Sequence, residues 1–312
     1  MKFSILIPLY NKAQSITSTI QCVQKQTYTD WEIVVVDGYS SDGSLEIIKE
    51  LAKSDERIHV FMQENRCGVT PARNESVAHA QYNLLAFLDA DDYWEPEYLE
   101  NMAKLIKDYP NAGIWGTNYG TIENGVKKQN TTLYPLHRGI IENPWIKGNP
   151  YWTSAIVISR DAFNKVGGFD NRIIYGEDID LWYRIMLHNE CVYEDKVFSY
   201  YRIDAENRAC NHVFPLQIHI PYYIEKYSED RKNNKDFRRF FDLMMLYRLY
   251  PYCFERKYKK EVNRLLKFID FSLQKRSMRL RFCFPYLYRF YRYIKGIKEE
   301  KLEEYQGGSS LK

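Results

Sequence analysis

The stretch Asn83–Asp92, NLLAFLDADD, joins an apolar run to three carboxylates, and it decides the expected fold. The run from Leu84 to Leu88 contains no polar residue, which is typical of a strand covered on both faces in an α/β sheet. In open sheets of this kind ligands bind at the carboxyl ends of the strands, where Asp89, Asp91 and Asp92 lie. Carboxylate and phosphate oxygens are the ligands that Mg²⁺ and Mn²⁺ prefer, so the stretch predicts a divalent-cation site.

The same carboxylates also allow a simpler interpretation. Asp92 precedes YWEPEYL, in which Glu95 and Pro96 suit the first turn of a helix, so Asp92 can act as an N-cap. The DxD spacing predicts Asp89 and Asp91 on one side of an extended backbone, with Asp92 on the other. Both interpretations hold together if Asp92 caps the helix and Asp91 binds the cation.

Short apolar runs alternate with helix-like segments around this stretch, which predicts a mainly parallel central sheet flanked by helices. In the first half we expect strands at residues 3–9, 32–36, 57–62 and 112–118, and helices at 15–26, 71–80, 96–108 and after the Asp42-Gly43 turn. In the second half the pattern predicts a strand at 152–160, a short helix at 161–166 and a longer helix after Glu177 and Asp178.

Composition bounds the fold and the compartment. A chain of 312 residues, 45% hydrophobic and 16% aromatic, can bury a full core in one large domain or two unequal ones. The six cysteines contain no CxxC pair, which indicates reduced structural thiols in a cytosolic protein without a zinc site. The start of the chain reads as a strand rather than a signal peptide, and no run approaches about 18 apolar residues. We therefore expect the protein to stay inside the cell without spanning a membrane.

Basic and aromatic residues concentrate towards the end of the chain. Residues 231–300 carry 20 Lys and Arg against 7 Asp and Glu, although the net charge of the whole chain is +3. The pattern is helical, and rings interleaved with cations suit peripheral contact with an anionic membrane surface. The alternative is a helical extension whose aromatic side chains pack against the rest of the protein. Nucleic acid is not expected as a partner, because no nucleic-acid motif accompanies the charge.

The loop after the first strand excludes two nucleotide-binding classes, since it contains neither GxGxxG nor GxxxxGK[ST]. It carries Pro8, Tyr10 and Asn11, and such groups can hold a nucleoside with its base stacked on Tyr10. Asp37 ends the second strand, where a carboxylate can accept hydrogen bonds from a base N–H or from ribose hydroxyls. Tyr and Asn are also ordinary loop residues, and Asp37 can simply initiate a turn.

Six segments occur in the order and spacing of the glycosyltransferase family 2 pattern, which the chain resembles from its start to about residue 205. They are SILIPLYN (4–11), VVDGYSSDGS (35–44), NRCGVTPARN (65–74), FLDADD (87–92), GGFD (167–170) and EDIDLWYR (177–184). The resemblance implies an α/β GT-A fold, Rossmann-like, with a mainly parallel sheet and here a C-terminal α-helical extension. It also implies a nucleotide-sugar donor, Mn²⁺ or Mg²⁺ as cofactor, and inversion of the anomeric centre.

Position by position, the resemblance also implies roles for residues of the donor site. It places Pro8, Tyr10 and Asn11 beside the nucleoside, Asp37 at the base, Arg73 near the nucleotide, Asp89 at the ribose or donor sugar, and Asp91 at the metal. Many members have a second Asp where this chain has Gly38, followed here by Tyr39. The base is therefore less constrained, and we favour UDP, with GDP and dTDP still open.

The second half carries the residues expected to act on the acceptor. The resemblance implies that Asp178 is the general base, with Glu177 as the alternative, although carboxylates at a helix start can simply be caps. Trp152 and Trp182 are candidate acceptor-binding residues, although buried Trp more often packs in a core. Many relatives have a His near the diphosphate at the position of Asp204. Whether Asp204, Arg208 or His212 replaces that His stays open at this point.

These observations predict a metal-dependent, non-processive, inverting glycosyltransferase of the hexosyltransferase type. It would move one sugar to a hydroxyl of a glycan or lipid-linked acceptor in cell-surface polysaccharide synthesis, at the cytoplasmic face of the membrane, and a homodimer is compatible with the sequence. The alternatives are a non-catalytic sugar-nucleotide-binding protein and a sugar-nucleotide pyrophosphorylase. The expected organisation is a GT-A domain at 1–214, split into a nucleotide-sugar half at 1–118 and an acceptor half at 119–214, then a helical extension at 215–305 and a disordered tail at 306–312.

Overall fold

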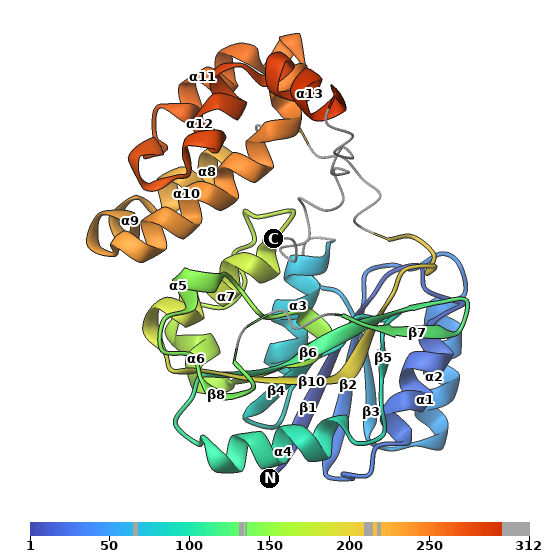
Figure 1. Cartoon of the computed structure of the whole chain (residues 1–312). Coiled ribbons are helices and arrows are strands. Elements are labelled where there is room, and N and C mark those ends of the chain that lie inside the picture. The colour runs from blue at the N-terminus through green and yellow to red at the C-terminus, as the bar shows by residue number, and fades with distance from the viewer. Residues whose placement is uncertain (65–67, 131–133, 135, 209–214, 217–219, 295–312) are drawn as a thin grey trace. The chain divides into compact units, whose positions relative to one another are not determined.

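The structure is a computed structural model that describes residues 1–64, 68–130, 134, 136–208, 215–216 and 220–294. The chain divides into two compact units, which Figure 1 shows as a sheet with its helices and as a set of helices. The sheet unit comprises Met1–Glu142 and Asn149–Arg208, and the helical unit comprises Asn143–Gly148 and Ala209–Lys312. The tail that was expected to be disordered, 306–312, lies outside the described residues.

A ten-stranded sheet runs through the sheet unit in the order β3-β2-β1-β4-β9-β6-β10-β5, with β7 paired to β6 and β8 to β10. The strands are β1 (Phe3–Leu9), β2 (Trp31–Asp37), β3 (Ile58–Met62), β4 (Leu84–Phe87), β5 (Tyr93–Trp94), β6 (Ile114–Glu123), β7 (Val126–Gln129), β8 (Arg138–Ile140), β9 (Ile156–Ser159) and β10 (Cys191–Arg202). Strands β1 to β4 pair in parallel, as the sequence predicts for the first half. The second half is mixed, since β9 runs antiparallel to β4 and β6 while β10 is parallel to β6.

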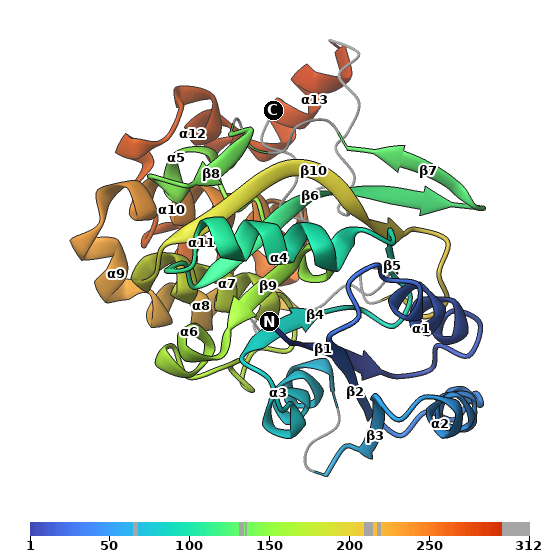
Figure 2. The same cartoon turned by 90° about the horizontal axis from the view of Figure 1, so that it is seen from below.

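Helices cover both faces of the first strands, and Figure 2 shows α3 on one side with α1 and α2 on the other. The helices of this unit are α1 (Ile16–Gln24), α2 (Ser44–Ser54), α3 (Val69–His79), α4 (Tyr98–Asp108), α6 (Arg160–Lys165) and α7 (Glu177–His188). Alternate residues of β1, from Phe3 to Leu9, lie in one core with Ile20 of α1, Ile48 of α2 and Met102 of α4. Because both faces of the sheet are covered, the strand sequences are almost continuously apolar.

The parallel register brings the carboxyl ends of β1, β2 and β4 to one edge of the sheet. Leu9 is paired with Asp37, and just beyond β4 the amide of Leu88 donates to the carbonyl of Leu6 (3.1 Å). The loop after β1, Asp37 and the acidic residues after β4 therefore emerge together, at the edge where sheets of this kind bind ligands.

The sequence prediction is wrong immediately after the acidic strand. The amide of Asp92 donates to the carbonyl three residues earlier (3.0 Å), so residues 89–92 form a turn rather than an extended segment. Tyr93–Trp94 then pairs with β10, and α4 begins only at Tyr98, with Glu97 at its N-cap. Asp92 is therefore not a helix cap, because antiparallel pairing with a distant strand takes the residues that the local pattern assigns to a first turn. The strand expected from residue 152 is shortened in the same way by a 3₁₀ turn, η1, before β9.

The helical unit has an aromatic core of its own. Its helices are α5 (Pro144–Lys147), α8 (Ile220–Lys226), α9 (Ser228–Asn233), α10 (Lys235–Leu249), α11 (Lys259–Leu266), α12 (Arg276–Cys283) and α13 (Pro285–Ile294). Phe237 of α10 is fully buried and packs edge-on against Trp145 (4.6 Å between ring centroids) and Tyr227 (5.5 Å). Packing inside this unit thus explains the aromatic residues of α10. Within the described part of the chain, no helix combines the length and low polarity needed to cross a bilayer.

Candidate active site

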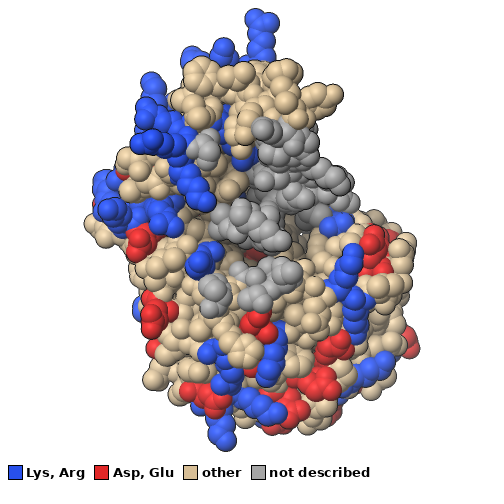
Figure 3. Space-filling view, in the orientation of Figure 1, with Lys and Arg blue, Asp and Glu red and all other residues tan. Residues whose placement is uncertain are grey.

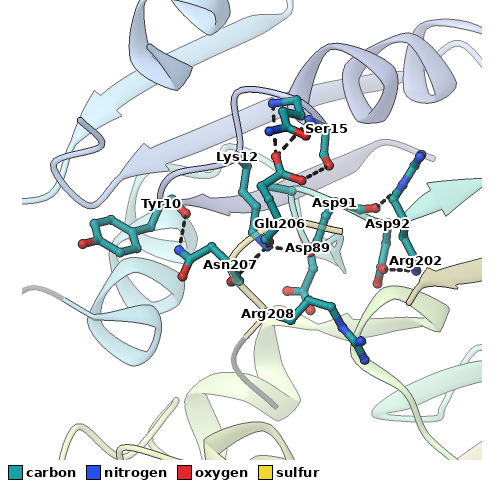
Figure 4. Close-up of polar contacts among 12 residues, drawn as sticks. Tyr10, Lys12, Ser15, Asp89, Asp91, Asp92, Arg202, Glu206, Asn207 and Arg208 are labelled. Atoms are coloured by element: carbon teal, nitrogen blue, oxygen red, sulfur yellow. Dashed lines mark hydrogen bonds and ion pairs between the residues drawn. The ribbon is translucent and has the colours of Figure 1, made fainter. Parts of the chain in front are cut away.

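The turn at residues 89–92 gives its three carboxylates different surroundings. Asp92 is fully buried, Asp91 is 7% exposed, and Asp89 is partly exposed. Figure 4 shows Asp91 beside Lys12 and Asp92 beside Arg202. Because residues 89–92 form a turn and not an extended segment, Asp91 and Asp92 contact different partners.

Asp92 holds the acidic turn in the sheet unit. Its carboxylate accepts hydrogen bonds from Oγ of Ser154 (2.6 Å) and from the amide of Arg202 (3.2 Å). Ser154 lies in η1 (Thr153–Ala155), and its Oγ also accepts a hydrogen bond from the amide of Asp89 (3.0 Å). Burial raises the pKa of Asp92 well above its usual range, and the neighbouring carboxylates raise it further. Asp92 therefore connects the turn to β10 and η1.

Asp91, the predicted metal ligand, is paired with a lysine. Its Oδ2 lies 2.6 Å from Nζ of Lys12, and the two side chains are 10% and 12% exposed. Burial raises the pKa of Asp91, the Lys12 ammonium opposes that shift, and Asp89 adds to it. The negative charge of Asp91 is therefore balanced by a cation that belongs to the protein.

Arg73 of α3 joins two acidic residues that lie far apart in the sequence. Its Nη2 is 2.7 Å from Oδ1 of Asp89, and its Nη1 is 2.5 Å from Oε1 of Glu177. Burial disfavours the charge of Arg73, but the two carboxylates outweigh it and raise the pKa. One buried guanidinium thereby brings together the predicted nucleotide residue, the acidic turn and the start of α7.

The predicted general base and its alternative are the first two residues of α7. Glu177 is buried against Arg73, and burial raises its pKa to about 7. Asp178 is partly exposed, and its Oδ2 accepts a hydrogen bond from Oγ1 of Thr153 (2.9 Å). The N-cap position of α7 is Gly176, so neither acid is the N-cap residue. Asp178 is the more accessible of the two carboxylates, whereas Glu177 is committed to an ion pair.

An unsatisfied acceptor marks the carboxyl end of β2. Asp37 is fully buried, and its Oδ2 accepts a hydrogen bond from the amide of Ser40 (3.0 Å). Its Oδ1 has no hydrogen-bond partner among the residues that the structure describes. A buried acceptor without a donor is costly, so a donor supplied by a ligand fits this position. The ring of Tyr10 lies close to Gly38, the residue after Asp37, since a Cβ atom at position 38 would be 3.8 Å from Cδ2 of Tyr10. Tyr10 is 55% exposed.

Hydrogen bonds connect the loops after β1 and β2. Oδ1 of Asn11 accepts a hydrogen bond from the backbone amide of Ser41 (2.9 Å), and the backbone amide of Asn11 donates to Oγ of Ser40 (2.9 Å). Asn11 has φ +52° and Tyr39 has φ +64°, which are left-handed conformations that side chains rarely adopt. Pro8 lies within β1 and is partly exposed. The side chain of Asn11, which was predicted to lie beside a nucleoside, thus helps to fix the shape of both loops.

The described part of the segment after β10, residues 203–208, does not supply an obvious third metal ligand. Oδ2 of Asp204 accepts from the amide of Asn124 (2.7 Å), and Arg208 donates to the hydroxyl of Tyr201 (2.7 Å). His212 lies outside the described residues. Among the described residues, no three His, Cys, Asp or Glu side chains are grouped so as to hold a metal ion. Any divalent ion here would therefore depend on one or two carboxylates together with substrate oxygens.

The two candidate acceptor residues differ in exposure. Trp182 is fully buried and packs against Phe87 and Phe169, with ring centroids 6.3 and 6.4 Å away. Trp152 is partly exposed and stacks on Tyr119 (4.9 Å). Trp182 is therefore a core residue, and of the two only Trp152 presents surface.

Sequence reasoning missed three residues that organise the site: Lys12, Ser154 and Glu206. Lys12 directly follows PLYN, and that position is the one signal that could have suggested it. Ser154 and Glu206 lie in segments without a recognisable motif, and their roles depend on contacts with residues 62 and 191 positions away.

The comparisons with known proteins agree on the family. The model described as Glycosyl transferase family 2 matches residues 4–167. The putative teichuronic acid biosynthesis glycosyltransferase TuaG of Bacillus subtilis (strain 168) is 37% identical over 105 residues, which are 34% of this chain and 42% of TuaG. The UDP-Glc:alpha-D-GlcNAc-diphosphoundecaprenol beta-1,3-glucosyltransferase WfgD of Escherichia coli is 31% identical over 255 residues, 74% of this chain and 97% of WfgD.

A solved structure supports the predicted GT-A fold. The crystal structure of S. aureus TarS 1-349 in complex with UDP-GlcNAc matches with a TM-score of 0.74 at 17% identity, covering 96% of this chain and 93% of that one. This likeness bears on the fold alone. The family match covers more than half of the chain and all of the strands that carry the acidic edge. The chain therefore belongs to glycosyl transferase family 2.

Proposed function

We propose that this protein moves one sugar from a nucleotide-sugar, with inversion, to a hydroxyl of a glycan or lipid-linked acceptor in cell-surface polysaccharide synthesis. The single observation that carries the proposal is the acidic edge of the sheet, where Arg73 links Asp89 to Glu177 and a buried oxygen of Asp37 has no partner in the part of the chain that the structure describes. The relatives support the direction of this proposal: TuaG is named for teichuronic acid biosynthesis, and WfgD is named for a diphosphoundecaprenol acceptor.

UDP is the nucleotide that we favour. The free Oδ1 of Asp37 can accept the imide N–H of uracil, while the exposed ring of Tyr10 offers a surface on which the base can stack. Thymine carries the same imide N–H and guanine a related one, so GDP and dTDP are comparison ligands. WfgD is named for UDP-Glc and TarS was solved with UDP-GlcNAc, which adds weight to UDP.

The residues present fit Mn²⁺ or Mg²⁺ held mainly by substrate. Asp91, with Asp89 two residues away in the same turn, offers the oxygen ligands that these ions prefer, and the diphosphate would complete the coordination. When bound, the ion would stabilise the negative charge that develops on the leaving diphosphate. Oδ2 of Asp91 is paired with Lys12 in this structure, so an ion that used this oxygen would require the pair to separate.

The chain's own residues would position the donor and activate the acceptor. Arg73 keeps Asp89 and Glu177 in place through two charge-assisted hydrogen bonds. Asp178 would take the proton of the acceptor hydroxyl, and Thr153 orients its carboxylate. Attack by that hydroxyl opposite the leaving diphosphate inverts the anomeric centre in one displacement, and the partly exposed Trp152 would contact the acceptor.

The experiment is a screen for ligand-dependent stabilisation followed by turnover. UDP-Glc, UDP-GlcNAc, GDP-Man and dTDP-Glc are each added with and without Mn²⁺, since a ligand that binds only the folded state raises the melting temperature. We expect a UDP-sugar to give the largest rise and to require Mn²⁺. No rise with any of the four, together with no release of nucleotide diphosphate in the presence of glycan or polyprenyl-diphosphate acceptors, would refute the proposed function.

We also propose that α12 and α13 meet an anionic membrane from the cytoplasmic side, where a lipid-linked acceptor would be found. Leu287, Phe290, Tyr291 and Ile294 recur at the spacing of one helical stripe and are 52–65% exposed. Arg289 is also exposed on α13, and Figure 3 shows Lys and Arg gathered on the helical unit. Large apolar side chains flanked by cations suit the boundary between head groups and acyl chains.

Vesicle flotation tests the membrane contact with the full chain. We expect binding to phosphatidylglycerol vesicles that falls with salt and is lost in Leu287→Glu/Phe290→Glu. Phe268→Glu is the matched control, because Phe268 is a 50% exposed aromatic residue outside α12 and α13. Equal flotation of the wild type, the double variant and the Phe268→Glu control contradicts the proposed membrane contact. It is also contradicted if the double variant changes the oligomeric state of the protein but leaves flotation unchanged.

A further inference from the structure

The side chain of Lys12 ends among three acceptors. Its Nζ lies 2.6 Å from Oδ2 of Asp91, 2.5 Å from the carbonyl oxygen of Glu206 and 3.2 Å from that of Asn207, as Figure 4 shows. An ammonium group has three N–H donors, so each can have an acceptor here. Lys12 thus joins the loop after β1 to the acidic turn and to residues 203–208, which we call the closing segment.

The closing segment is also held at the start of α1. Oε1 of Glu206 accepts from the amides of Gln14 and Ser15 (3.1 Å each), and its Oε2 accepts from Oγ of Ser15 (2.6 Å). A carboxylate is stabilised at this end of a helix by the unpaired N–H groups and the helix dipole. The side-chain amide of Asn207 donates to the carbonyl of Tyr10 (3.4 Å). Backbone and side-chain contacts therefore place the closing segment against the loop that is expected to hold the nucleoside.

Asp91 cannot serve Lys12 and a divalent cation through the same oxygen. A Mg²⁺ or Mn²⁺ ion bound to Oδ2 would lie about 2.1 Å from it, next to an ammonium that is 2.6 Å from that oxygen. Neither side chain is more than 12% exposed, so water screens their charges weakly. For a divalent ion to use Oδ2, the ammonium must move away from that oxygen, and the flexible stem of Lys12 allows it to do so.

We propose that Lys12 is a resident cation that the donor complex displaces from Asp91, and that this exchange releases the closing segment. The inference rests on the proposed function. Without donor, Lys12 neutralises Asp91 and holds the carbonyl groups of Glu206 and Asn207. In the donor complex Asp91 would hold the divalent ion through Oδ2, and the Lys12 ammonium would pair with diphosphate oxygens. The two carbonyl groups then lose their donor, so donor binding is coupled to the position of the closing segment.

A purely structural ion pair is the alternative, and the chain contains one for comparison. Lys127 of β7 and Glu95 lie 2.7 Å apart, with side chains 35% and 24% exposed, and neither residue belongs to the acidic turn at 89–92. Cutting a structural pair changes stability without improving the binding of a metal. The proposed exchange, in contrast, predicts that removal of the Lys12 charge raises the affinity for Mn²⁺ and lowers the affinity for UDP.

The test measures Mn²⁺ binding by the full chain without nucleotide, from the electron paramagnetic resonance signal of the free ion. We expect Lys12→Met to bind Mn²⁺ about tenfold more tightly than the wild type, because the competing cation is gone, and Lys127→Met to be unchanged. With Mn²⁺ saturating, titration calorimetry should show Lys12→Met binding UDP about tenfold more weakly, because a charge-assisted contact to the diphosphate is lost. Lys12→Arg keeps the charge and should stay within about twofold of wild type in both measurements.

Equal or weaker Mn²⁺ binding by Lys12→Met, including no detectable binding by either protein, overturns the inference, and so does unchanged UDP affinity. Lys12→Gln, which keeps a neutral donor for the two carbonyl groups, gives the same Mn²⁺ test if Lys12→Met does not fold. Failure of the proposed function is recognised separately: the wild type would then bind no nucleotide in the presence of Mn²⁺. If the wild type binds UDP with Mn²⁺ and the variants match it, the exchange alone is wrong.

Discussion

Replacing Arg73 with Met tests whether the guanidinium group stabilises the buried carboxylate of Glu177 at the start of α7. Met fills a similar apolar volume but carries no charge. The side chains of Arg73 and Glu177 are 5% and 8% exposed, so the pair is buried, and removing one partner of such a pair costs about 3–5 kcal/mol. Asp89, 29% exposed and 2.7 Å from Arg73, also loses its partner, and water screens its charge more than that of Glu177. We therefore expect unfolding free energy to fall by about 3–5 kcal/mol at pH 8.

The loss should depend on pH through Glu177. Burial raises its folded pKa to about 7 while Arg73 opposes the shift, and its unfolded pKa is about 4.3. Stability from such a group is fully present below the unfolded pKa and is lost as the pH rises through the folded pKa. Without Arg73 the folded pKa rises further, so the variant should keep losing about 1.4 kcal/mol per pH unit above pH 7, where the wild type levels off.

Urea unfolding at pH 6 and pH 8, followed by tryptophan fluorescence, measures this difference, since five of the six tryptophans lie in the sheet unit. Arg57→Met is the matched control, because Arg57 is 38% exposed and its pair with Asp55 should contribute less than about 1 kcal/mol. The double variant Arg73→Met/Glu177→Gln should recover much of the lost unfolding free energy, since it removes both charges of the buried pair. A cost below about 1 kcal/mol at pH 8, equal costs at both pH values, or no recovery in the double variant would refute the reasoning.

Three other variants probe the same edge of the sheet. Asp178→Asn should abolish sugar transfer while UDP binding by calorimetry stays within about twofold, because the proton acceptor is lost and the donor contacts remain; a variant with normal turnover removes Asp178 from this role. Tyr39→Gly should raise the melting temperature by about 2 °C, because φ +64° costs a side chain about 1 kcal/mol that glycine avoids; a lower melting temperature would show that the Tyr39 side chain is stabilising. Glu177→Gln should reduce the fall in wild-type stability between about pH 4.5 and pH 7, since the raised pKa of Glu177 contributes to that fall together with those of Asp91 and Asp92; an unchanged pH profile from urea unfolding would assign the fall to the other groups.

Local patterns in the sequence were sufficient for the parallel first half of the sheet, and they predicted the edge at which its strands end. Apolar runs such as 3–9 and 84–88 form strands because both faces of the sheet are covered, and the order of strands and helices predicted parallel pairing in the first half. Because parallel strands end at one edge, the position of Asp37 and of the acidic turn along the chain is enough to predict that they lie together.

Local patterns failed where a contact with a distant segment overrides propensity. Residues 93–94 read as a helix start, but they pair with β10. Trp182 could have faced an acceptor, but it lies among aromatic residues of the core. The sequence left open whether the aromatic residues of α10 meet a membrane or pack inside the protein, and they pack within the helical unit, where most of the described large apolar side chains that are exposed lie on α13. In each case packing against residues distant in sequence outweighs the local preference that neighbouring residues in the sequence indicate.

The amino-acid sequence is sufficient to identify which residues bear charge at the ends of the strands, because strand order and side-chain chemistry are properties of the chain. The partner of each charge, in contrast, depends on the folded arrangement. Arg73 reaches Glu177 across 104 positions and Lys12 reaches Asp91 across 79, separations over which no local pattern operates. Ion pairing requires that two charges lie within a few ångströms of each other, and for residues this far apart in sequence folding sets that distance.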